Sequence, residues 1–207
     1  TAHTEQLAPE TRLAYDAFKK ELLDQYNHLK ENGVAMSSWT RPGQAYANSL
    51  EMMSDLRRNN RLYFFRGGSE FPPGHPLAEL VPGTPYSYND LFRAVHDIYG
   101  HSVNGNSFGP MGETKAWLDH RKMFSPLARK AMTTETLGQN SWVNFGAHLR
   151  EKIPGPGGRF RRTPRAGEPG FTPPAERPYA EQKAILIDDS PALSLRGFSL
   201  SDPGNPG

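Results

Sequence analysis

Two histidines flank a short glycine-containing segment near the middle of the 207-residue chain, in the run His96-Asp97-Ile98-Tyr99-Gly100-His101. Neutral imidazole is the commonest metal ligand among protein side chains. Residues five apart on an unbroken α-helix point about 140° away from each other, so both rings can face one metal only if the helix ends or is distorted between them. Gly100 offers such an ending, because glycine adopts left-handed conformations at little cost. The pair therefore indicates a metal site that a carboxylate from elsewhere would complete as a 2-His-1-carboxylate iron centre.

The third ligand has four candidates: Glu113, Glu135, Asp119 and Asp90. Glu135 is preferred because it lies among three threonines, whose hydroxyl groups suit the hydrogen-bonding needs of a metal-bound carboxylate. A neighbouring helix can also carry such a carboxylate back to a shared site, as in bundle metal centres. Glu113 is the rival. His120 follows it by seven residues on one helix face, so the pair could hold a second metal or support the ligands of the first.

The same residues also have ordinary interpretations without a metal. One histidine of the pair could be a hydrogen-bonded core residue and the other a surface residue, and Glu135 could cap a helix or pair with an arginine. Tyr99, Phe108 and Trp142 are candidate walls of a substrate pocket, although a tryptophan belongs to a core more often than to a cofactor site.

Composition limits the class of protein. Hydrophobic residues make up 36% of the chain, and 20 glycines with 19 prolines require a large share of loop. The net charge of +2 does not favour a nucleic-acid partner or an anionic membrane. The absence of cysteine excludes disulfides and thiolate metal sites, and it fits a cytoplasmic protein. No apolar run is long enough to span a membrane, so no membrane partner is expected.

The pattern of apolar residues predicts a mostly α fold: a single compact helical domain with short β segments. Apolar stripes predict helices over 9–32, 44–59, 89–99 and 112–124, followed by one that starts at Ser125-Pro126. The aromatic run at 62–65 predicts a strand. Residues 1–150 would form the metal-binding domain. Residues 151–207 would form an arm rich in proline and glycine, with a short helix over 178–186 packing back on the domain; four arginines of the arm could touch phosphates or simply be solvated.

Three short segments, in the same order along the chain, resemble the aromatic amino acid hydroxylases. The run HDIYGH at 96–101 resembles the iron-binding segment of that family, and TTETLG at 133–138 resembles the segment that carries its glutamate ligand. The run YFFRGGSE at 63–70 is similar to the segment whose arginine holds the amino-acid carboxylate. The resemblance covers about a third of the chain at scattered positions. Segments 108–113 and 139–144 instead resemble uncharacterised domains of phage and mobile-element proteins.

The resemblance implies an iron mono-oxygenase that hydroxylates an amino acid or a related small molecule. Its Fe(II) would be held by His96, His101 and Glu135, with O2 as co-substrate and a tetrahydropterin or another reductant as electron source. Arg66 would clamp the substrate carboxylate, and Asp97 corresponds to a pterin-contact position.

Two alternatives belong to other classes. The same three ligands could hold zinc and a water in a hydrolase, with Glu113 or Asp97 as the general base. The chain could also be a non-catalytic phage accessory or interaction protein, in which the histidines are structural.

Overall fold

The structure is a computed structural model that describes residues 7–66, 71–153 and 160–187. The elements in chain order are α1 (Pro9–Glu31), β1 (Ala35–Trp39), α2 (Ser49–Asn59), β2 (Arg61–Phe65), α3 (Tyr88–His96), α4 (Pro110–His120), α5 (Pro126–Thr133) and α6 (Gln139–Phe145). Two π-helical turns matter for the site, η2 (Asp97–Ser102) after α3 and η4 (Thr134–Gly138) between α5 and α6. The predicted mostly α fold is confirmed. Within the described ranges, no helix is both long enough and apolar enough to cross a membrane.

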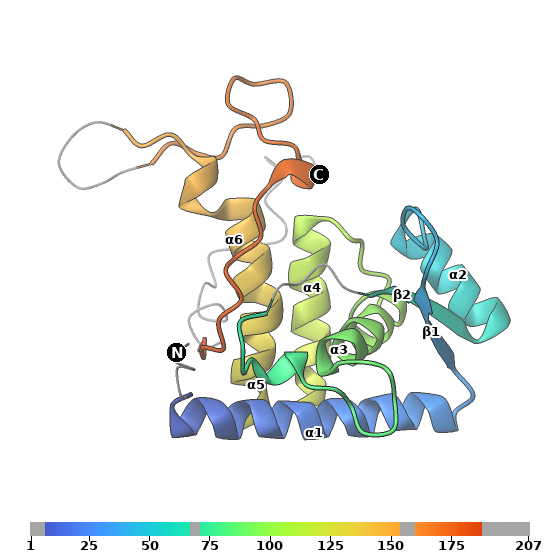
Figure 1. The fold of residues 1–207 in the computed structure, drawn as a ribbon. Helices are drawn as coiled ribbons and strands as arrows, with labels where there is room; N and C mark the ends of the chain where they lie inside the picture. Colours follow the sequence, from blue (N-terminus) through green and yellow to red (C-terminus); the bar gives the residue numbers. More distant parts are fainter. Residues whose placement is uncertain (1–6, 67–70, 154–159, 188–207) are drawn as a thin grey trace.

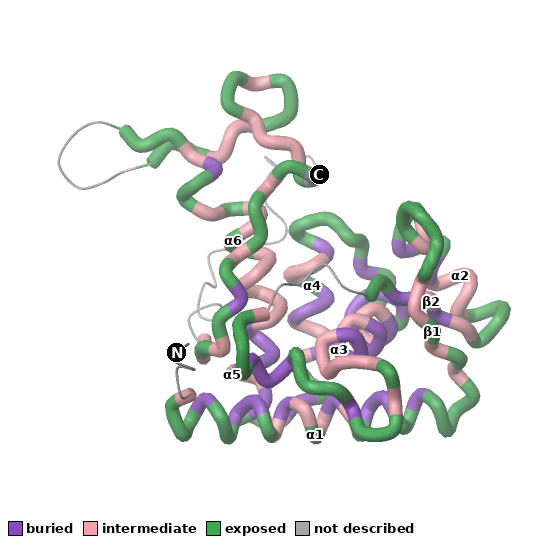
Figure 2. Tube along the Cα trace, viewed as in Figure 1, coloured by how far each residue is buried: buried purple, intermediate pink, exposed green. Residues whose placement is uncertain are grey.

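Helix α1 lies beneath α3, α4 and α5 in the view of Figure 1. It packs against α5 and α3, and buried positions recur along it while its outer side stays exposed (Figure 2). The buried stripe includes Tyr15, Phe18 and Leu22, none of which exposes any surface. Burial of each large apolar side chain contributes roughly 1.5–3 kcal/mol. The apolar residues whose spacing predicted a helix over 9–32 therefore also form the buried stripe against which α3 and α5 pack.

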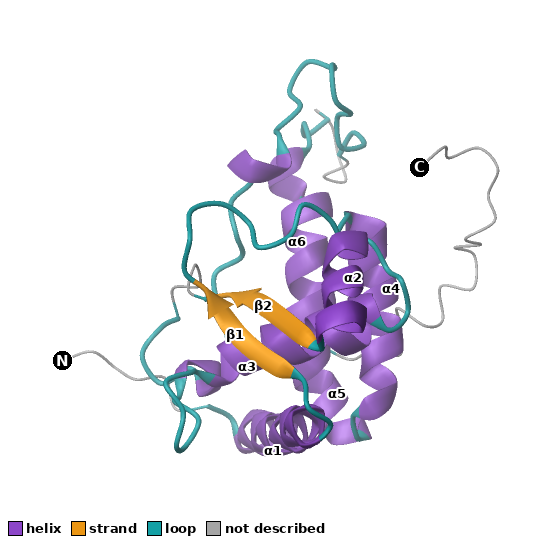
Figure 3. Ribbon diagram, turned by 90° about the vertical axis from the view of Figure 1, so that its right-hand side faces the viewer, coloured by secondary structure: helices purple, strands orange, loops and turns teal. Residues whose placement is uncertain are grey.

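Strands β1 and β2 pair in parallel, in register from Ala35 with Arg61 to Trp39 with Phe65. Figure 3 shows this small sheet with α2 as its crossover connection. The predicted strand at 62–65 is confirmed as part of β2, whereas β1 was not predicted, because its centre is the polar pair Ser37-Ser38. Helix α2 begins at Ser49 and not at residue 44, since the side chain of Asn48 caps it by accepting from the Glu51 N–H at 3.0 Å.

Helix α3 begins with a capping box. Ser87 accepts from the Asp90 N–H at 3.2 Å, and the Asp90 carboxylate accepts from the Ser87 N–H at 3.0 Å. Leu91 and Val95 on its inner face are fully buried. This fixed start and buried face hold the C-terminal turn of α3, which carries His96, against the core.

The segment 177–187 is irregular and lies along α5, η4 and α6 (Figure 1). The prediction of a helix over 178–186 is wrong. The segment's polar groups bond to its neighbours: Thr134 Oγ1 donates to the Ile185 carbonyl at 2.8 Å, and the side-chain amides of Gln139 and Gln182 donate to each other at 2.7 and 3.0 Å. The first of these contacts satisfies a backbone carbonyl that a helix would have satisfied internally, and the amide pair ties the segment to α6. The rest of the predicted arm, at 154–159 and 188–207, lies outside the described residues.

Candidate metal centre

The π-helical turn η2 brings His96 and His101 to the same side of the chain. Its bonds run from residue i to i+5, as from the Val103 N–H to the Ile98 carbonyl at 2.9 Å. The wider turn compensates for the angle that separates residues five apart on an α-helix. The two rings lie with their centroids 5.3 Å apart. The predicted distortion between the histidines is thus confirmed, although the helix widens there and does not end.

Gly100 permits close approach and does not supply a left-handed turn. Its φ is not among the positive values in the described chain. A Cβ at this position would lie 2.9 Å from Cε1 of His96 and 3.1 Å from Cβ of Ala116. Such distances are shorter than normal van der Waals contact. The missing side chain therefore lets α4 and the His96 ring meet above η2.

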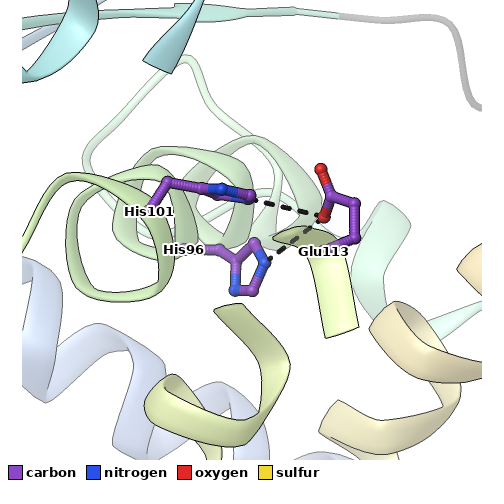
Figure 4. A group of neighbouring side chains, drawn as sticks. All are labelled: His96, His101 and Glu113. Carbon is purple, nitrogen blue, oxygen red and sulfur yellow. Dashed lines mark ion pairs between the residues drawn. The ribbon is translucent and has the colours of Figure 1, made fainter. Parts of the chain in front are cut away.

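Glu113, in the first turns of α4, completes the group. Its Oε2 lies 3.4 Å from Nε2 of His101 and 3.9 Å from Nε2 of His96. One ligand atom from each of the three residues lies within 4.8 Å of the others, and Figure 4 shows the side chains pointing toward one another. Ligands on one ion with bonds of about 2.1 Å are themselves about 3.0–3.4 Å apart. This group, called the triad below, could hold a metal ion after a small contraction.

The hydrogen bond of His101 leaves the correct ring nitrogen available. Its Nδ1 lies 3.1 Å from the carbonyl oxygen of Asn106, which can only accept, so Nδ1 carries the proton. In the neutral ring the lone pair is then on Nε2, the atom that faces Glu113. The Asn106 side chain holds this loop in place by donating to the Gly100 carbonyl at 2.8 Å and to Asp119 at 3.0 Å. A backbone carbonyl behind a histidine is typical of metal ligands.

A longer chain of hydrogen bonds orients His96. Gln25 donates its amide to the Met123 carbonyl at 3.4 Å, and its Oε1 lies 2.8 Å from Nε2 of His120, which therefore carries the proton. Nδ1 of His120 is then the acceptor for Nδ1–H of His96, at 3.0 Å. This leaves Nε2 of His96 unprotonated, and among the described residues that buried atom has no hydrogen-bond partner. A buried orphan lone pair beside Nε2 of His101 and a carboxylate is the strongest sign that the residues fit a metal.

The charges at the triad are coupled. Burial alone would raise the pKa of Glu113, but hydrogen bonds and charge from His101 and His96 outweigh it and lower this pKa to about 2. Burial lowers the pKa of His96, and it also lowers that of His120 well below its usual value. Burial raises the pKa of Asp97, the neighbour of His96, to about 7. Burial alone would lower the pKa of His101, but the hydrogen bond and charge of Glu113 outweigh it and raise this pKa. The metal-free triad thus has an ionised carboxylate and a neutral His96, and a metal ion would take the place of the proton that Glu113 favours on Nε2 of His101.

The triad opens onto a cleft of about 1560 Å³. His96, Asp97, Phe108, Glu113 and Glu135 all line it. Aromatic rings and side-chain amides make up about half of its remaining wall, which consists of Phe71, Pro72, Asn89, Phe92, Arg93, Gly109, Pro110, Thr136, Gln139, Asn140, Val143, Asn144, Pro174, Tyr179, Ala180, Glu181 and Gln182. A metal on the triad would therefore face a pocket large enough for a small organic molecule.

Glu135, the preferred third ligand from the sequence, lies outside the triad; among the described residues, the group is completed by its rival Glu113. The Glu135 carboxylate accepts from the Tyr15 hydroxyl through Oε1, and that oxygen lies 3.7 Å from Nε2 of His75. We call Tyr15, His75 and Glu135 the acid cluster. Threonines do surround Glu135, but Thr134 and Thr136 bond to backbone carbonyls and not to its carboxylate. The polar neighbourhood that favoured Glu135 therefore has a structural role.

Other candidates from the sequence are placed differently. Arg66 donates to the Pro85 carbonyl, lies 3.5 Å from the Asp90 carboxylate and is not among the residues that line the cleft. Trp142 is 45% exposed and packs on His148, with ring centroids 4.7 Å apart. Tyr99 packs against His120 behind the triad, at 5.9 Å. Phe108 is the predicted wall residue that does line the cleft, with its ring 5.1 Å from that of His101.

Sequence reasoning missed the residues that support the site from behind. Gln25 is a buried polar side chain on the apolar stripe of α1, and this break in the stripe was the available signal. Tyr15 falls on the apolar stripe that predicts the helix over 9–32, so its position in the sequence indicates only a core residue. His75 carries no periodic signal, because it stands in a proline-rich loop. His120 had been singled out through its spacing from Glu113, and the structure places it behind His96 with no direct part in the triad.

No family model, curated protein or solved structure matches the chain. The function of the protein is therefore inferred from the geometry of the triad and the cleft.

Proposed function

We propose that the protein is a mononuclear non-haem Fe(II) oxygenase that acts on a small molecule bound in the cleft. The observation that carries this proposal is the convergence of Nε2 of His96 and Nε2 of His101 on one carboxylate oxygen of Glu113, at 3.9 and 3.4 Å. Two histidines and one carboxylate on one side of an ion are typical of iron oxygenases, which keep the other side open.

Iron bound there would supply the oxidising chemistry, drawing on O2 and a reductant such as a tetrahydropterin. The chain's own residues hold the ligands and shape the cleft. Asn106 and His120 fix the two imidazole tautomers, so neither ring has to reorganise when an ion enters. Phe92 and Phe108 cover the cleft side of the rings with apolar surface, which limits access of bulk water.

The cleft supports a substrate with both apolar and hydrogen-bonding parts. Its wall combines aromatic rings with the side-chain amides of Asn140 and Gln182. The carboxylate clamp expected at Arg66 has no support from the structure, because Arg66 lies against Asp90 and does not line the cleft. The proposal therefore names a small molecule, and an amino-acid substrate stays a prediction of the sequence resemblance.

An anaerobic Fe(II) titration with metal quantification tests the proposal, followed by measurement of O2 uptake in the presence of a tetrahydropterin or ascorbate. We expect one Fe(II) per chain and reductant-dependent O2 uptake. His96→Ala and His101→Ala should lose the metal, whereas the surface variant His28→Ala should keep it. Absence of stoichiometric metal in the wild-type protein would overturn the proposal.

The same donor set favours a second candidate, a zinc hydrolase, since two histidines and a glutamate also hold catalytic zinc. Asp97 beside the triad is then the candidate general base. Tight binding of zinc with no O2 uptake from the iron-loaded protein would decide for the hydrolase.

A further inference from the structure

Glu135 is a buried carboxyl group that lines the cleft, and no lysine or arginine of the described residues pairs with it. Its side chain is 4% exposed. Three groups face it, each from a different element: the Tyr15 hydroxyl from α1, the His75 ring from the loop before η1 (Pro76–Ala78), and the Gln139 amide from α6. An ionised carboxylate taken out of water without a cation is costly. The contacts therefore favour the neutral acid.

His75 does not supply the missing positive charge. Its Nδ1 accepts from the Leu77 N–H at 3.2 Å, so this nitrogen carries no proton and the ring is neutral. Burial lowers the pKa of His75 to about 4 in agreement with this. The single ring proton is on Nε2, which is buried, has no hydrogen-bond partner and lies 3.7 Å from Oε1 of Glu135. A metal would need a lone pair on that nitrogen, so the acid cluster is unsuited to metal binding.

The hydrogen bonds also locate the acid proton of Glu135. Oε1 already accepts from the Tyr15 hydroxyl and faces Nε2–H of His75. The proton therefore belongs on Oε2, whose one contact is the long 3.5 Å approach of the Gln139 amide. Burial raises the pKa of Glu135 to about 7, so the proton can leave and return near neutral pH.

We propose that Glu135 is the acid–base group of the cleft, a carboxylic acid that offers its Oε2 proton to a ligand lying between the acid cluster and the triad. The ligand would be one with an acceptor oxygen or nitrogen. Transfer moves the proton from Oε2 to that atom and leaves a carboxylate, which the Tyr15 hydroxyl stabilises through Oε1. The same carboxylate can take a proton back, so Glu135 is regenerated. The reaction in which Glu135 would act rests on the proposed function. The protonated state of Glu135 does not, because it is a property of the metal-free protein.

Isotope-edited infrared spectroscopy of the metal-free protein tests that state directly. With 13C-labelled glutamate, the wild-type protein should show a carboxylic C=O band that disappears as the pH rises through about 7, where an ordinary glutamate ionises near pH 4.3. Glu135→Gln should lack this band. The control Glu79→Gln, which removes a surface carboxylate paired with Lys19, should retain it. A wild-type spectrum without the band at pH about 6 would overturn the proposal, whether or not the protein binds iron.

Co(II) on the triad tests whether Glu135 shares the cleft with the metal. Asp97 also titrates near pH 7 in this cleft, so we expect the visible Co(II) spectrum of the wild-type protein to change there with contributions from both groups. The contribution of Glu135 should be lost in Glu135→Gln and kept in Glu79→Gln. An identical titration in wild type and Glu135→Gln would show that the two groups do not communicate, and the role at the metal would fail. If the wild-type protein does not bind Co(II), the proposed function fails. The infrared result still decides whether Glu135 is protonated.

Tyr15→Phe is the second variant. It removes the hydroxyl that stabilises the ionised form of Glu135 and keeps the ring in the core. The infrared midpoint should move to higher pH, by at least a few tenths of a unit. A midpoint that does not move, or that moves down, would contradict the assigned hydrogen bond and the placement of the proton on Oε2.

Discussion

Two histidine–glutamate clusters contribute their carboxylates to the wall of the cleft, and they differ in the backbone group that faces Nδ1 of the histidine. In the triad, a backbone carbonyl faces Nδ1 of His101, which keeps a proton on that nitrogen and leaves Nε2, toward Glu113, as the atom that can bind a metal. In the acid cluster, a backbone N–H faces Nδ1 of His75, which places a proton on Nε2 toward Glu135. A single neighbouring backbone group therefore decides whether a histidine–carboxylate pair can bind a metal or holds a proton.

The pKa values of the two carboxylates, Glu113 and Glu135, also differ between the clusters. Imidazoles beside Glu113 stabilise its ionised form and lower its pKa to about 2, whereas burial without a charged partner raises that of Glu135 to about 7. Two carboxylates of one cleft with pKa values moved apart are typical of sites that need a ligand and an acid at once.

The largest effect is expected from removing one histidine of each cluster. His101→Ala should abolish stoichiometric Fe(II) binding, because it removes one of two imidazole ligands. His75→Ala should retain one Fe(II) per chain, since its Nε2 carries a proton and faces Glu135, and neither residue belongs to the triad. Anaerobic titration with metal analysis measures both. Loss of metal in His75→Ala with an intact fold by circular dichroism would break the comparison.

The second prediction concerns stability against pH. The folded-state pKa of Glu135 is raised from 4.5 to about 7, so its contribution to stability is complete below pH 4.5 and is lost as the pH rises through about 7. Glu135→Gln keeps the acceptor for Tyr15 and cannot ionise. Its stability relative to wild type should therefore rise by about 3 kcal/mol between these pH values.

Urea unfolding of both proteins at several pH values measures this difference. Titration of His75 has the opposite sign, but it is common to both proteins and cancels. The surface variant Glu79→Gln should show no such slope. A flat difference for Glu135→Gln would mean that Glu135 ionises in the folded protein as it does in the unfolded chain.

Much of this comparison could not be drawn from the sequence. The apolar stripe on α1 predicted a long helix, and the spacing of His96 and His101 predicted a distorted turn. Both features could be predicted because they depend on the spacing of residues close together in the sequence. The choice between Glu113 and Glu135 depends on how α4 packs against η2 and η4, which no local pattern encodes. The tautomers depend on single backbone groups near the rings, and these are fixed only by the tertiary fold.

The third prediction compares the glycines of the two π-helical turns, Gly100 in η2 and Gly138 in η4. A Cβ at Gly100 would meet Cε1 of His96 at 2.9 Å and Cβ of Ala116 at 3.1 Å, both held in the core. A Cβ at Gly138 would meet only the tip of the Ile187 side chain closely, at 2.6 Å. Gly100→Ala should therefore destabilise the fold by about 1–3 kcal/mol and weaken Fe(II) binding through the displaced ring.

Gly138→Ala should change stability by less than about 1 kcal/mol, because a flexible side chain can move aside and alanine favours a helical backbone. Thermal unfolding and Fe(II) titration of the two variants give the comparison. Equal losses in both would mean that the turn at η2 has no special packing requirement.

The smallest expected effect lies at the far end of the chain of bonds behind His96. Gln25→Leu removes the acceptor for Nε2–H of His120, so His120 is free to exchange tautomers and no longer holds Nδ1–H of His96 in place. Part of the His96 population would then carry its proton on Nε2, where the metal must bind. Residues that orient a ligand histidine contribute about tenfold to hundredfold in metal affinity, and we expect the lower value because Gln25 acts through an intervening ring. Gln25→Glu retains an acceptor oxygen and should restore most of the affinity. If the leucine and glutamate variants bind Fe(II) equally, the tautomer of His96 is set by something other than this chain of bonds.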